Sequence, residues 1–365
     1  MTQATLTHLK NQILQAGLEK NILRITGSGS KDWYGNNLKG TPLLTKEYQG
    51  IINYQPDELV ITVRSGTSVK EVEETLAKNN QQFAFEPPHF KDATIGGMVC
   101  SGLAGPGRAA VGGLRDFVLG ANIMDGQGQI MSFGGTVMKN VAGYDVSRLL
   151  PGSLGTLALL LDVSIKVLPK PAASATLQVS MQQANAIALI NQLASQPWPI
   201  NASCWIGETM GTLYIRLNGA KAAVQTAITA FHKEYGMQLI SNDEADHFCM
   251  SIRDQQHPWF EKNSEKPLWR LAVSPTNPPL QLTGETLLEW HGGQRWYRGN
   301  ITNQEIKTIA RLNGGHAHVF KASNKTVDMF SSLKDNPLTA ALAPIEQRLR
   351  KSFDPQGVFA TERLI

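Results

Sequence analysis

The sequence predicts a mixed α+β protein with a glycine-rich first domain and a second domain in which strands and helices alternate. Glycine gathers in three clusters between residues 85 and 169, and strand-like and helix-like segments separate these clusters. Beyond Pro169 glycine becomes sparse, and apolar periodicities typical of strands and helices follow one another. A chain of 365 residues has room for about two or three such domains.

The first hundred residues predict a helix, two strands and a second helix. Residues 1–20 have the apolar spacing of an amphipathic helix, and residues 22–25 predict a short strand that runs into a turn-rich loop. Residues 59–64 predict the second strand. The helix after it is indicated by a capping box, in which Ser68 is followed three residues later by Glu71.

The rest of the chain predicts a β-hairpin and then alternating strands and helices. In order, the predicted segments are strand 117–124, strand 129–133, strand 157–168, helix 182–195, strand 212–217 and helix 220–235. The hairpin strands are joined by Asp125-Gly126-Gln127-Gly128, which favours a tight turn. The alternation after residue 171 is typical of a separate α/β domain, whereas residues 254–259 are too irregular for a prediction.

Composition and charge exclude several classes of protein. The 34 basic and 30 acidic residues give a net charge of +4 without any block of like charge, so no nucleic-acid partner is expected. Three cysteines without C-x-x-C spacing argue against a disulfide framework and a metal site. The first 20 residues lack the continuous apolar core of a signal peptide, and the apolar run 157–161 is too short to span a bilayer. These features predict a cytoplasmic protein with no direct membrane insertion.

The glycine clusters indicate backbone that lies against an anionic ligand, because bare N–H groups approach phosphate closely where no Cβ intervenes. The stretch 105–110, Gly-Pro-Gly-Arg-Ala-Ala, matches the dinucleotide fingerprint G-x-G-x-x-A, and Asp125 lies about 20 residues further on. That fingerprint requires a strand before it and a helix after it, whereas here further glycines lie on both sides, so the match is interpreted as accidental. Three short candidate anion cradles remain, at residues 27–31, 96–107 and 152–156.

Two of these cradles resemble the FAD-binding fold shared by vanillyl-alcohol oxidase and p-cresol methylhydroxylase. Thr26-Gly27-Ser28-Gly29-Ser30-Lys31 resembles the first phosphate loop of that fold, and residues 93–97 with 112–120 resemble its second FAD segment. Residues 133–146, which read Phe-Gly-Gly-Thr-Val-Met-Lys-Asn-Val-Ala-Gly-Tyr-Asp-Val, are similar to the signature of the FAD-binding subunits of bacterial glycolate oxidases, also called glycolate dehydrogenases. The resemblance extends to residues 287–296 and thus covers nearly the whole chain.

The resemblance implies a domain organisation. It places an FAD-binding domain of two α+β subdomains at residues 1–170 and an α/β cap domain at residues 171–335. Residues 336–365 then form a C-terminal segment whose helix returns to the FAD domain.

The resemblance also implies a function. It implies FAD-dependent oxidation of glycolate or D-lactate to the 2-oxo acid, within a complex that holds a sister FAD-binding catalytic subunit and an iron–sulfur subunit. Any association with the inner membrane is expected through these partners. In a second interpretation the fold is kept as a non-catalytic assembly module for the sister subunit. In a third interpretation the protein is a stand-alone reductase that takes hydride from NADPH, but the sequence contains no second nucleotide motif for that cofactor.

The resemblance assigns residues to the FAD. Backbone N–H groups of the first loop are expected to hold one side of the pyrophosphate, and a helix that begins near Gly97 the other side. The expected cofactor-binding residues are Thr26, Gly27, Ser28, Gly29, Ser30, Lys31, Pro88, Thr94, Gly96, Gly97, Ser101, Gly102, Gly105, Gly152, Ser153, Gly155 and Thr156. Non-covalent binding is expected, because the first loop has no histidine and Cys100 fits a small buried position. Taken alone, Ser153 and Thr156 also fit simple turn chemistry.

Oxidation of a 2-hydroxy acid requires a cation for the carboxylate and a base for the hydroxyl proton. The candidate cations are Arg253, Arg270 and Arg295, and the candidate bases are His257, His291, His316 and His318. The residues put forward as catalytic are His257, Arg295 and His316. The metal-binding His-x-x-Gly-Asp-Gly-Asn-x-His pattern of related catalytic subunits is absent from the sequence. At the C-terminus, an Asn-Pro-Gly-Arg-like ending typical of the family is replaced by a sequence that keeps only Arg363.

Overall fold

The computed structural model describes residues 2–135, 145–323, 325, 329–330 and 340–364. The chain folds into two compact units. Unit 1 comprises residues 1–103, 113–169 and 325–365, and unit 2 comprises residues 104–112 and 170–324. Most of the predicted signature at 133–146 lies outside the described residues. The proposed domain boundaries at 170 and 335 stay predictions.

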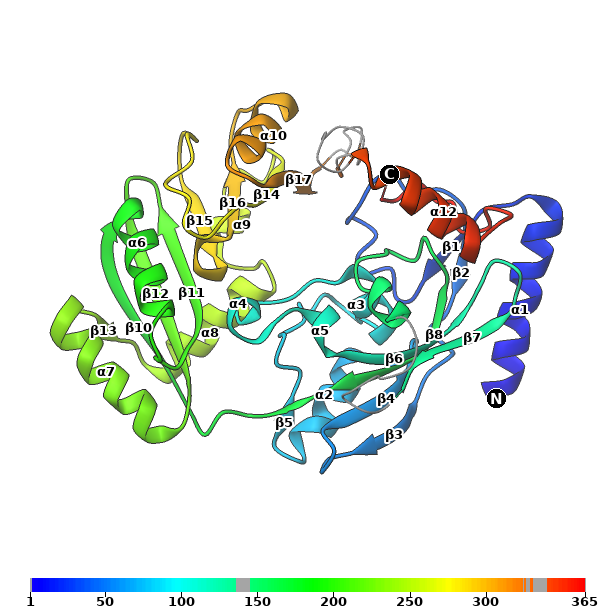
Figure 1. The fold of residues 1–365 in the computed structure, drawn as a ribbon, viewed down its shortest axis with the longest axis horizontal. Coiled ribbons are helices and arrows are strands. Elements are labelled where there is room, and N and C mark those ends of the chain that lie inside the picture. The colour runs from blue at the N-terminus through cyan, green and yellow to red at the C-terminus, as the bar shows by residue number, and fades with distance from the viewer. Residues whose placement is uncertain (1, 136–144, 324, 326–328, 331–339, 365) are drawn as a thin grey trace. The chain divides into compact units, whose positions relative to one another are not determined.

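Unit 1 is built on a five-stranded antiparallel sheet with the order β3-β4-β8-β6-β7 (Figure 1). These strands are β3 (Ile51–Gln55), β4 (Val60–Arg64), β8 (Leu159–Lys166), β6 (Val118–Met124) and β7 (Ile130–Gly134). Strand β8 is central and buried along nearly its whole length, including Asp162 and Ser164, which interrupt its otherwise apolar sequence. The predicted hairpin is confirmed, since β6 and β7 pair antiparallel across the turn at residues 125–129.

The remaining elements of unit 1 are helices and short strands outside this sheet. They are α1 (Thr2–Glu19), β1 (Leu23–Thr26), β2 (Thr41–Leu44), α2 (Val69–Ala77), β5 (Gln81–Gln82), α3 (Ile95–Ser101), α5 (Leu114–Phe117), η1 (Val146–Leu149), β9 (Leu168–Pro169) and α12 (Ala343–Phe353). Strands β1 and β2 pair in parallel, and β5 pairs with β9. Helix α1 buries Leu9 and Ile13 in a core that also holds Val358 and Phe359 from the C-terminal segment.

The structure tests two local sequence predictions, the capping box at Ser68 and the rejection of the dinucleotide fingerprint at residues 105–110. The helix predicted after Ser68 is present as α2, but the capping box is wrong, because the Ser68 side chain makes no capping hydrogen bond. The backbone around Ser68 pairs instead with the segment before α3, where Val69 N–H donates to the Ala93 carbonyl at 2.9 Å. The rejection of the dinucleotide fingerprint is confirmed: α4 (Arg108–Val111) is a single turn that a loop, and not a strand, precedes.

Unit 2 is built on an eight-stranded antiparallel sheet with the order β13-β10-β12-β11-β15-β16-β14-β17. The strands are β10 (Ala173–Gln182), β11 (Ile200–Gly207), β12 (Met210–Gly219), β13 (Gln238–Leu239), β14 (Leu268–Ala272), β15 (Thr286–Glu289), β16 (Gln294–Arg298) and β17 (His316–Lys321). The helical elements besides α4 are α6 (Gln183–Ala194), α7 (Lys221–Tyr235), α8 (Asn242–Arg253), α9 (Pro258–Glu261), η2 (Trp290–Gly292) and α10 (Asn303–Leu312). Within the described ranges, no helix is long and apolar enough to cross a membrane.

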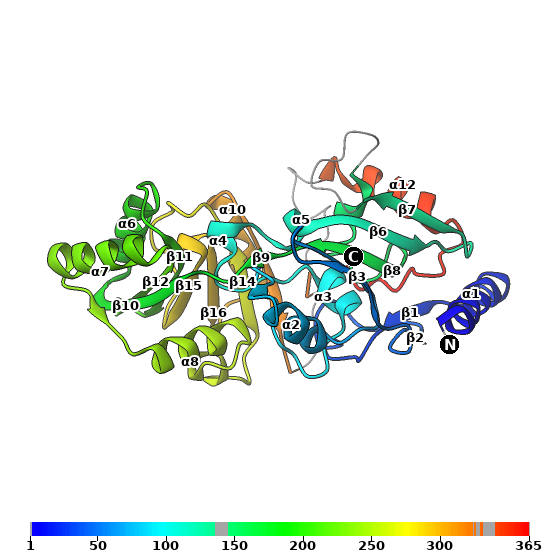
Figure 2. The same ribbon diagram turned by 90° about the horizontal axis from the view of Figure 1, so that it is seen from below.

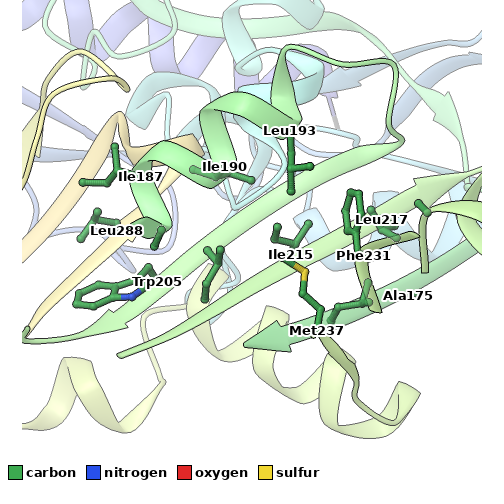
Figure 3. Close-up of a cluster of buried hydrophobic side chains, with 14 of the residues drawn as sticks. Ala175, Ile187, Ile190, Leu193, Trp205, Ile215, Leu217, Phe231, Met237 and Leu288 are labelled. Carbon is green, nitrogen blue, oxygen red and sulfur yellow. The ribbon is translucent and has the colours of Figure 1, made fainter. Parts of the chain in front are cut away.

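Helices cover both faces of this sheet. Ile190 and Leu193 of α6 and Phe231 of α7 pack on the face that carries Leu213 and Ile215 of β12 (Figure 3). The residue between these two on the strand, Tyr214, faces the other way and stacks on Phe248 of α8, with ring centroids 4.0 Å apart. Figure 2 shows α6 and α7 on one side of the strands and α8 on the other. A hydrophobic core of unit 2 therefore lies between β10–β12 and helices α6 and α7.

Replacing Phe231 by alanine is expected to destabilise unit 2 by about 3–5 kcal/mol, because this fully buried ring leaves a cavity in the α6/α7 core. The measurement is urea unfolding followed by circular dichroism. Leu312→Ala, at a side chain that is 78% exposed, is the matched control and should change stability by less than about 0.5 kcal/mol. Equal unfolding midpoints for the two variants would contradict this packing.

Candidate functional site

A cleft of about 620 Å³, part of it open to solvent, lies in unit 1 where three segments meet. The first is the loop after β1, the second is the start of α3, and the third is the turn around Gly155. Leu154 N–H donates to the Cys100 carbonyl at 2.8 Å, which joins the third segment to α3. The predicted residues that line the cleft are Thr26, Gly27, Ser28, Gly29, Ser30, Lys31, Thr94, Gly96, Gly97, Ser101 and Gly155.

The loop after β1 presents unused backbone donors. The N–H groups of Ser28, Gly29 and Ser30 donate to none of the described residues. Gly29 adopts a φ of +73°, and its carbonyl accepts from Asp32 N–H at 3.0 Å, which curls the loop around the cleft. Successive free N–H groups in a curled loop form a concave site for an anion.

The start of α3 forms the opposite wall. Thr94 is its N-cap, and the Thr94 Oγ1 atom accepts from Gly97 N–H at 3.3 Å. The predicted helix near Gly97 is confirmed as α3, which begins two residues earlier, at Ile95. Its first N–H groups are already bonded, because those of Ile95 and Gly96 donate to the Thr67 and Ser65 carbonyls at 2.8 and 2.7 Å. The helix start therefore shapes the cleft, and the free donors come from the first loop.

Two glycines allow these walls to approach each other. A Cβ atom on Gly27 would lie 2.3 Å from Thr94 Oγ1, far inside contact distance. A Cβ atom on Gly96 would lie 2.9 Å from the Cβ of Ser65. Only glycine fits at these two positions while the walls keep their spacing.

Lys31 places a buried ammonium group in the cleft. The residue is 8% exposed, and its Nζ atom lies 5.5 Å from the centroid of the Phe90 ring. Among the described residues this ammonium makes no hydrogen bond or ion pair. Burial, together with the nearby charge of Arg363, lowers the pKa of Lys31 to about 8. A buried cation without a counter-charge is costly, so the site favours a ligand that supplies negative charge.

Arg363 ties the C-terminal segment to the first loop. Its side chain is buried, and its guanidinium donates to the carbonyl oxygens of Tyr34, at 3.1 Å, and Lys31. Asn36 N–H in turn donates to the Arg363 carbonyl at 2.8 Å. A residue more than 300 positions away in sequence thus fixes the loop that carries the free donors.

Replacing Arg363 by methionine is expected to destabilise unit 1 by about 2–4 kcal/mol, because the carbonyl groups of Tyr34 and Lys31 each lose a charged donor. Urea unfolding of purified protein measures this loss. The control is Lys39→Met, which removes the neighbouring ion pair with Glu362; both of its side chains are more than half exposed, so stability should barely change. An Arg363→Met variant as stable as the control would show that the tail does not anchor the loop.

The other predicted cofactor residues lie outside the lining of the cleft. Gly102 packs on the backbone of Gly152, and Thr156 donates to the Ser153 carbonyl at 2.8 Å, so this pair makes the simple turn foreseen as an alternative. Gly105 belongs to unit 2, where its carbonyl accepts from the Trp290 indole at 3.0 Å. Pro88 is buried in a loop.

Sequence reasoning missed three polar residues that line the cleft, Asp32, Thr45 and Ser65. Ser65 directly follows β4, and its carbonyl accepts from Gly96 N–H. A Ser-Gly pair at the end of a buried strand was the available signal for this residue. Nothing in the local sequence marks Thr45, whose position depends on the pairing of β1 with β2.

The three residues predicted to be catalytic all belong to unit 2, and they are not brought together. Arg295 is a correction: its guanidinium donates to the carbonyl oxygens of Gly292, Pro278 and Asn277, so it holds loops in place. His257 caps α9 by accepting from Trp259 N–H at 3.2 Å. His316 begins β17 and lies on the opposite face of the sheet from Arg295. Arg295 pairs with residue 271 of β14 and His316 pairs with residue 272, and successive residues of a strand point to opposite faces.

Comparison with known proteins identifies the family. Residues 10–147 match the family model described as an FAD binding domain. The glycolate oxidase subunit GlcE of Escherichia coli (strain K12) is 40% identical over 358 residues, which cover 98% of this chain and 96% of that protein. The chain belongs to the glycolate oxidase subunit GlcE family. GlcE-type sequence similarity thus extends over both units.

More distant relatives match a smaller share of the GlcE-family chain or share its fold at low sequence identity. The glycolate oxidase subunit GlcD of Bacillus subtilis (strain 168) is 31% identical over 149 residues, 41% of this chain and 32% of that protein. A crystal structure of p-cresol methylhydroxylase with substrate bound superposes with a TM-score of 0.71 at 12% identity, over 98% of this chain and 87% of that one. The predicted α+β fold of this flavoprotein family is therefore confirmed.

Proposed function

We propose that this chain is the FAD-binding subunit of a glycolate oxidase complex and that it holds FAD non-covalently in the cleft of unit 1. One observation carries the proposal: the buried Lys31 ammonium has no counter-charge among the described residues, and it lies beside a loop whose backbone donors are unused. A pyrophosphate supplies both the negative charge and the acceptors that this arrangement lacks.

The residues present fit an FAD molecule. The N–H groups of Ser28, Gly29 and Ser30, with Lys31, would hold the pyrophosphate, and Gly27 and Gly96 leave room for it between the walls. When bound, FAD supplies a two-electron acceptor for the oxidation of a substrate. The Cys100 thiol lines the cleft, and burial raises the pKa of this thiol to about 11. It is therefore a poor nucleophile at neutral pH, which supports non-covalent binding.

The reaction and the partners are proposed from the relatives. GlcE and GlcD carry the names of glycolate oxidase subunits, which supports a complex that contains a sister FAD-binding subunit. Within it we propose oxidation of glycolate or D-lactate to the 2-oxo acid, with electrons passed to an iron–sulfur subunit. The complex would be cytoplasmic, and any association with the inner membrane would come through its partners.

The first experiment tests FAD binding directly. The full chain is purified, and its flavin is released by denaturation and quantified by chromatography. The expected result is about one FAD per chain without a covalent remnant. A chain that stays colourless after incubation with FAD would contradict the proposal.

The second experiment tests the reaction. Glycolate or D-lactate is added anaerobically to the FAD-loaded chain, and the flavin absorbance is followed. Bleaching supports an oxidoreductase subunit. A persistent yellow colour with every 2-hydroxy acid, together with co-purification of a second flavoprotein, would support the assembly-module interpretation instead.

A further inference from the structure

Three neighbouring strands of unit 2 bring an arginine, two histidines and a tryptophan to one face of the sheet. Arg270 of β14 pairs directly with Trp296 of β16 on one side and with His318 of β17 on the other. His316, two residues before His318, lies on the same face. Figure 1 shows β16, β14 and β17 as neighbours at this end of the sheet.

The guanidinium of Arg270 is held in place by one hydrogen bond and two aromatic rings. Its Nε atom donates to Gln294 Oε1 at 2.6 Å, and its Cζ atom lies 5.0 Å and 5.8 Å from the ring centroids of Trp290 and Trp296. Among the described residues Arg270 forms no ion pair, and its two terminal nitrogens take part in no hydrogen bond. The side chain is thus an oriented fork whose outer N–H groups are available to a ligand.

The supports of Arg270 are themselves fixed by a buried network. The carboxylate of Glu289 accepts from Gln294 Nε2 at 2.9 Å and from Trp296 Nε1 at 2.6 Å. Trp290 is held by its bond to the Gly105 carbonyl and has an unusual φ of 53°. A strained backbone that aims a side chain at a charged group is typical of functional sites.

The histidines add a hydrogen-bonding group beside the fork. The rings of His316 and His318 are nearly parallel, with centroids 6.4 Å apart. Burial, followed by the charge of Arg270, lowers the pKa of both imidazoles, so both are neutral near pH 7. A neutral imidazole accepts a hydrogen bond from a hydroxyl group.

We propose that Arg270 and His316 form the binding site for a small 2-hydroxy acid, with the carboxylate on the two terminal nitrogens of Arg270 and the 2-hydroxyl on His316. The identity of the ligand rests on the proposed function. A planar guanidinium binds a carboxylate through two parallel hydrogen bonds. Because Gln294 already orients the Arg270 side chain, less conformational entropy is lost when the carboxylate binds. Arg295, favoured by sequence for this role, already donates from each of its three nitrogens to a backbone carbonyl.

The test is isothermal titration of the full chain with sodium glycolate, sodium acetate and glycolamide at constant ionic strength. The wild type should bind glycolate more tightly than acetate, and glycolamide not measurably. Arg270→Gln should weaken glycolate binding at least tenfold, and Arg270→Lys should fall between, because lysine keeps the charge but loses the fork. Arg311→Gln, at an exposed residue of α10 in the same unit, should bind as the wild type does.

His316→Ala should bind glycolate no more tightly than acetate, because the partner of the 2-hydroxyl is gone. Circular dichroism melting checks folding, and if Arg270→Gln is unfolded, Arg270→Lys decides the result. Undiminished glycolate binding by the folded Arg270 variant, or equal binding of glycolate and glycolamide by the wild type, would overturn the inference.

The flavin content of each sample separates this inference from the proposed function. Glycolate binding that depends on Arg270 in a chain that retains no FAD would support the carboxylate site and contradict FAD binding. A chain that retains FAD but binds glycolate independently of Arg270 would support FAD binding and contradict the carboxylate site.

Discussion

The Gly27→Ala variant is expected to lose FAD affinity by a factor of about 10 to 100, because the added methyl group strains the contact between the two walls of the cleft by about 1–3 kcal/mol. The new Cβ atom would lie 2.3 Å from Thr94 Oγ1, so either the first loop or the N-cap of α3 has to move. Either movement displaces the N–H groups of Ser28, Gly29 and Ser30 from a pyrophosphate that they would hold. Equilibrium titration of flavin fluorescence with the purified variant measures the loss.

Gly135→Ala is the matched control for this prediction. Gly135 lies in the same unit, and a Cβ atom there would meet none of the residues that the structure describes within 4 Å. The control should bind FAD as the wild type does. Wild-type affinity in Gly27→Ala would mean that the ligand does not require the close approach of the two walls.

The Lys31→Met variant is expected to bind FAD about 10- to 100-fold more weakly, because it removes a charge-assisted contact to phosphate while keeping the apolar stem. The same change removes a buried cation that lacks a counter-charge, so the free protein should be as stable as the wild type or more stable. Lower affinity without lower stability distinguishes a ligand-binding lysine from a structural one. Lys91→Met, at an exposed residue of the same unit, should change neither quantity.

FAD affinity and the stability of the free protein should both depend on pH, because the pKa of Lys31 is about 8 in the folded protein against 10.5 for a free side chain. Folding disfavours the charged form, so this residue should make the wild type more stable as pH rises from about 8 towards 10.5. An anionic ligand favours the charged form, so binding takes up a proton, and FAD affinity should fall about tenfold between pH 7 and pH 9.

Titration calorimetry in buffers of different ionisation enthalpy measures this proton uptake. Lys31→Met should abolish it and flatten the pH profile of FAD affinity. Uptake that persists in the variant would assign the titrating group to another residue.

Most helices and strands of the fold could be predicted from the sequence because they depend on local periodicity. Helices α1, α2, α6 and α7 and the β6–β7 hairpin lie within a few residues of their predicted positions. The capping box at Ser68 failed because capping depends on what else the backbone contacts, and the pairing of residues 68 and 94 is a long-range interaction. The single turn of α9, in a segment that gave no prediction, is set by Pro258 and the His257 cap.

The cofactor cleft was partly predictable for a similar reason. Glycines 27, 29, 96, 97 and 155 mark a place where backbone approaches a ligand, and that requirement is visible in sequence. The catalytic assignment in unit 2 was less successful, because a cation and a base are common residues whose use depends on their partners. Arg295 and Arg270 lie on neighbouring strands, yet each nitrogen of Arg295 donates to a carbonyl group, whereas the two terminal nitrogens of Arg270 make no hydrogen bond to the described residues.

The sequence by itself determined the fold class, the family resemblance and the nature of the ligand as an anion held on bare backbone, because each depends on residue types at short spacing. Only the tertiary structure decided which donors remain unused at the cleft, that Lys31 lacks a counter-charge among the described residues, and which arginine presents an open fork. These are properties of hydrogen-bond saturation and burial, which depend on every neighbouring segment. Arg363, which joins the last residues of the chain to the first loop, is the clearest example.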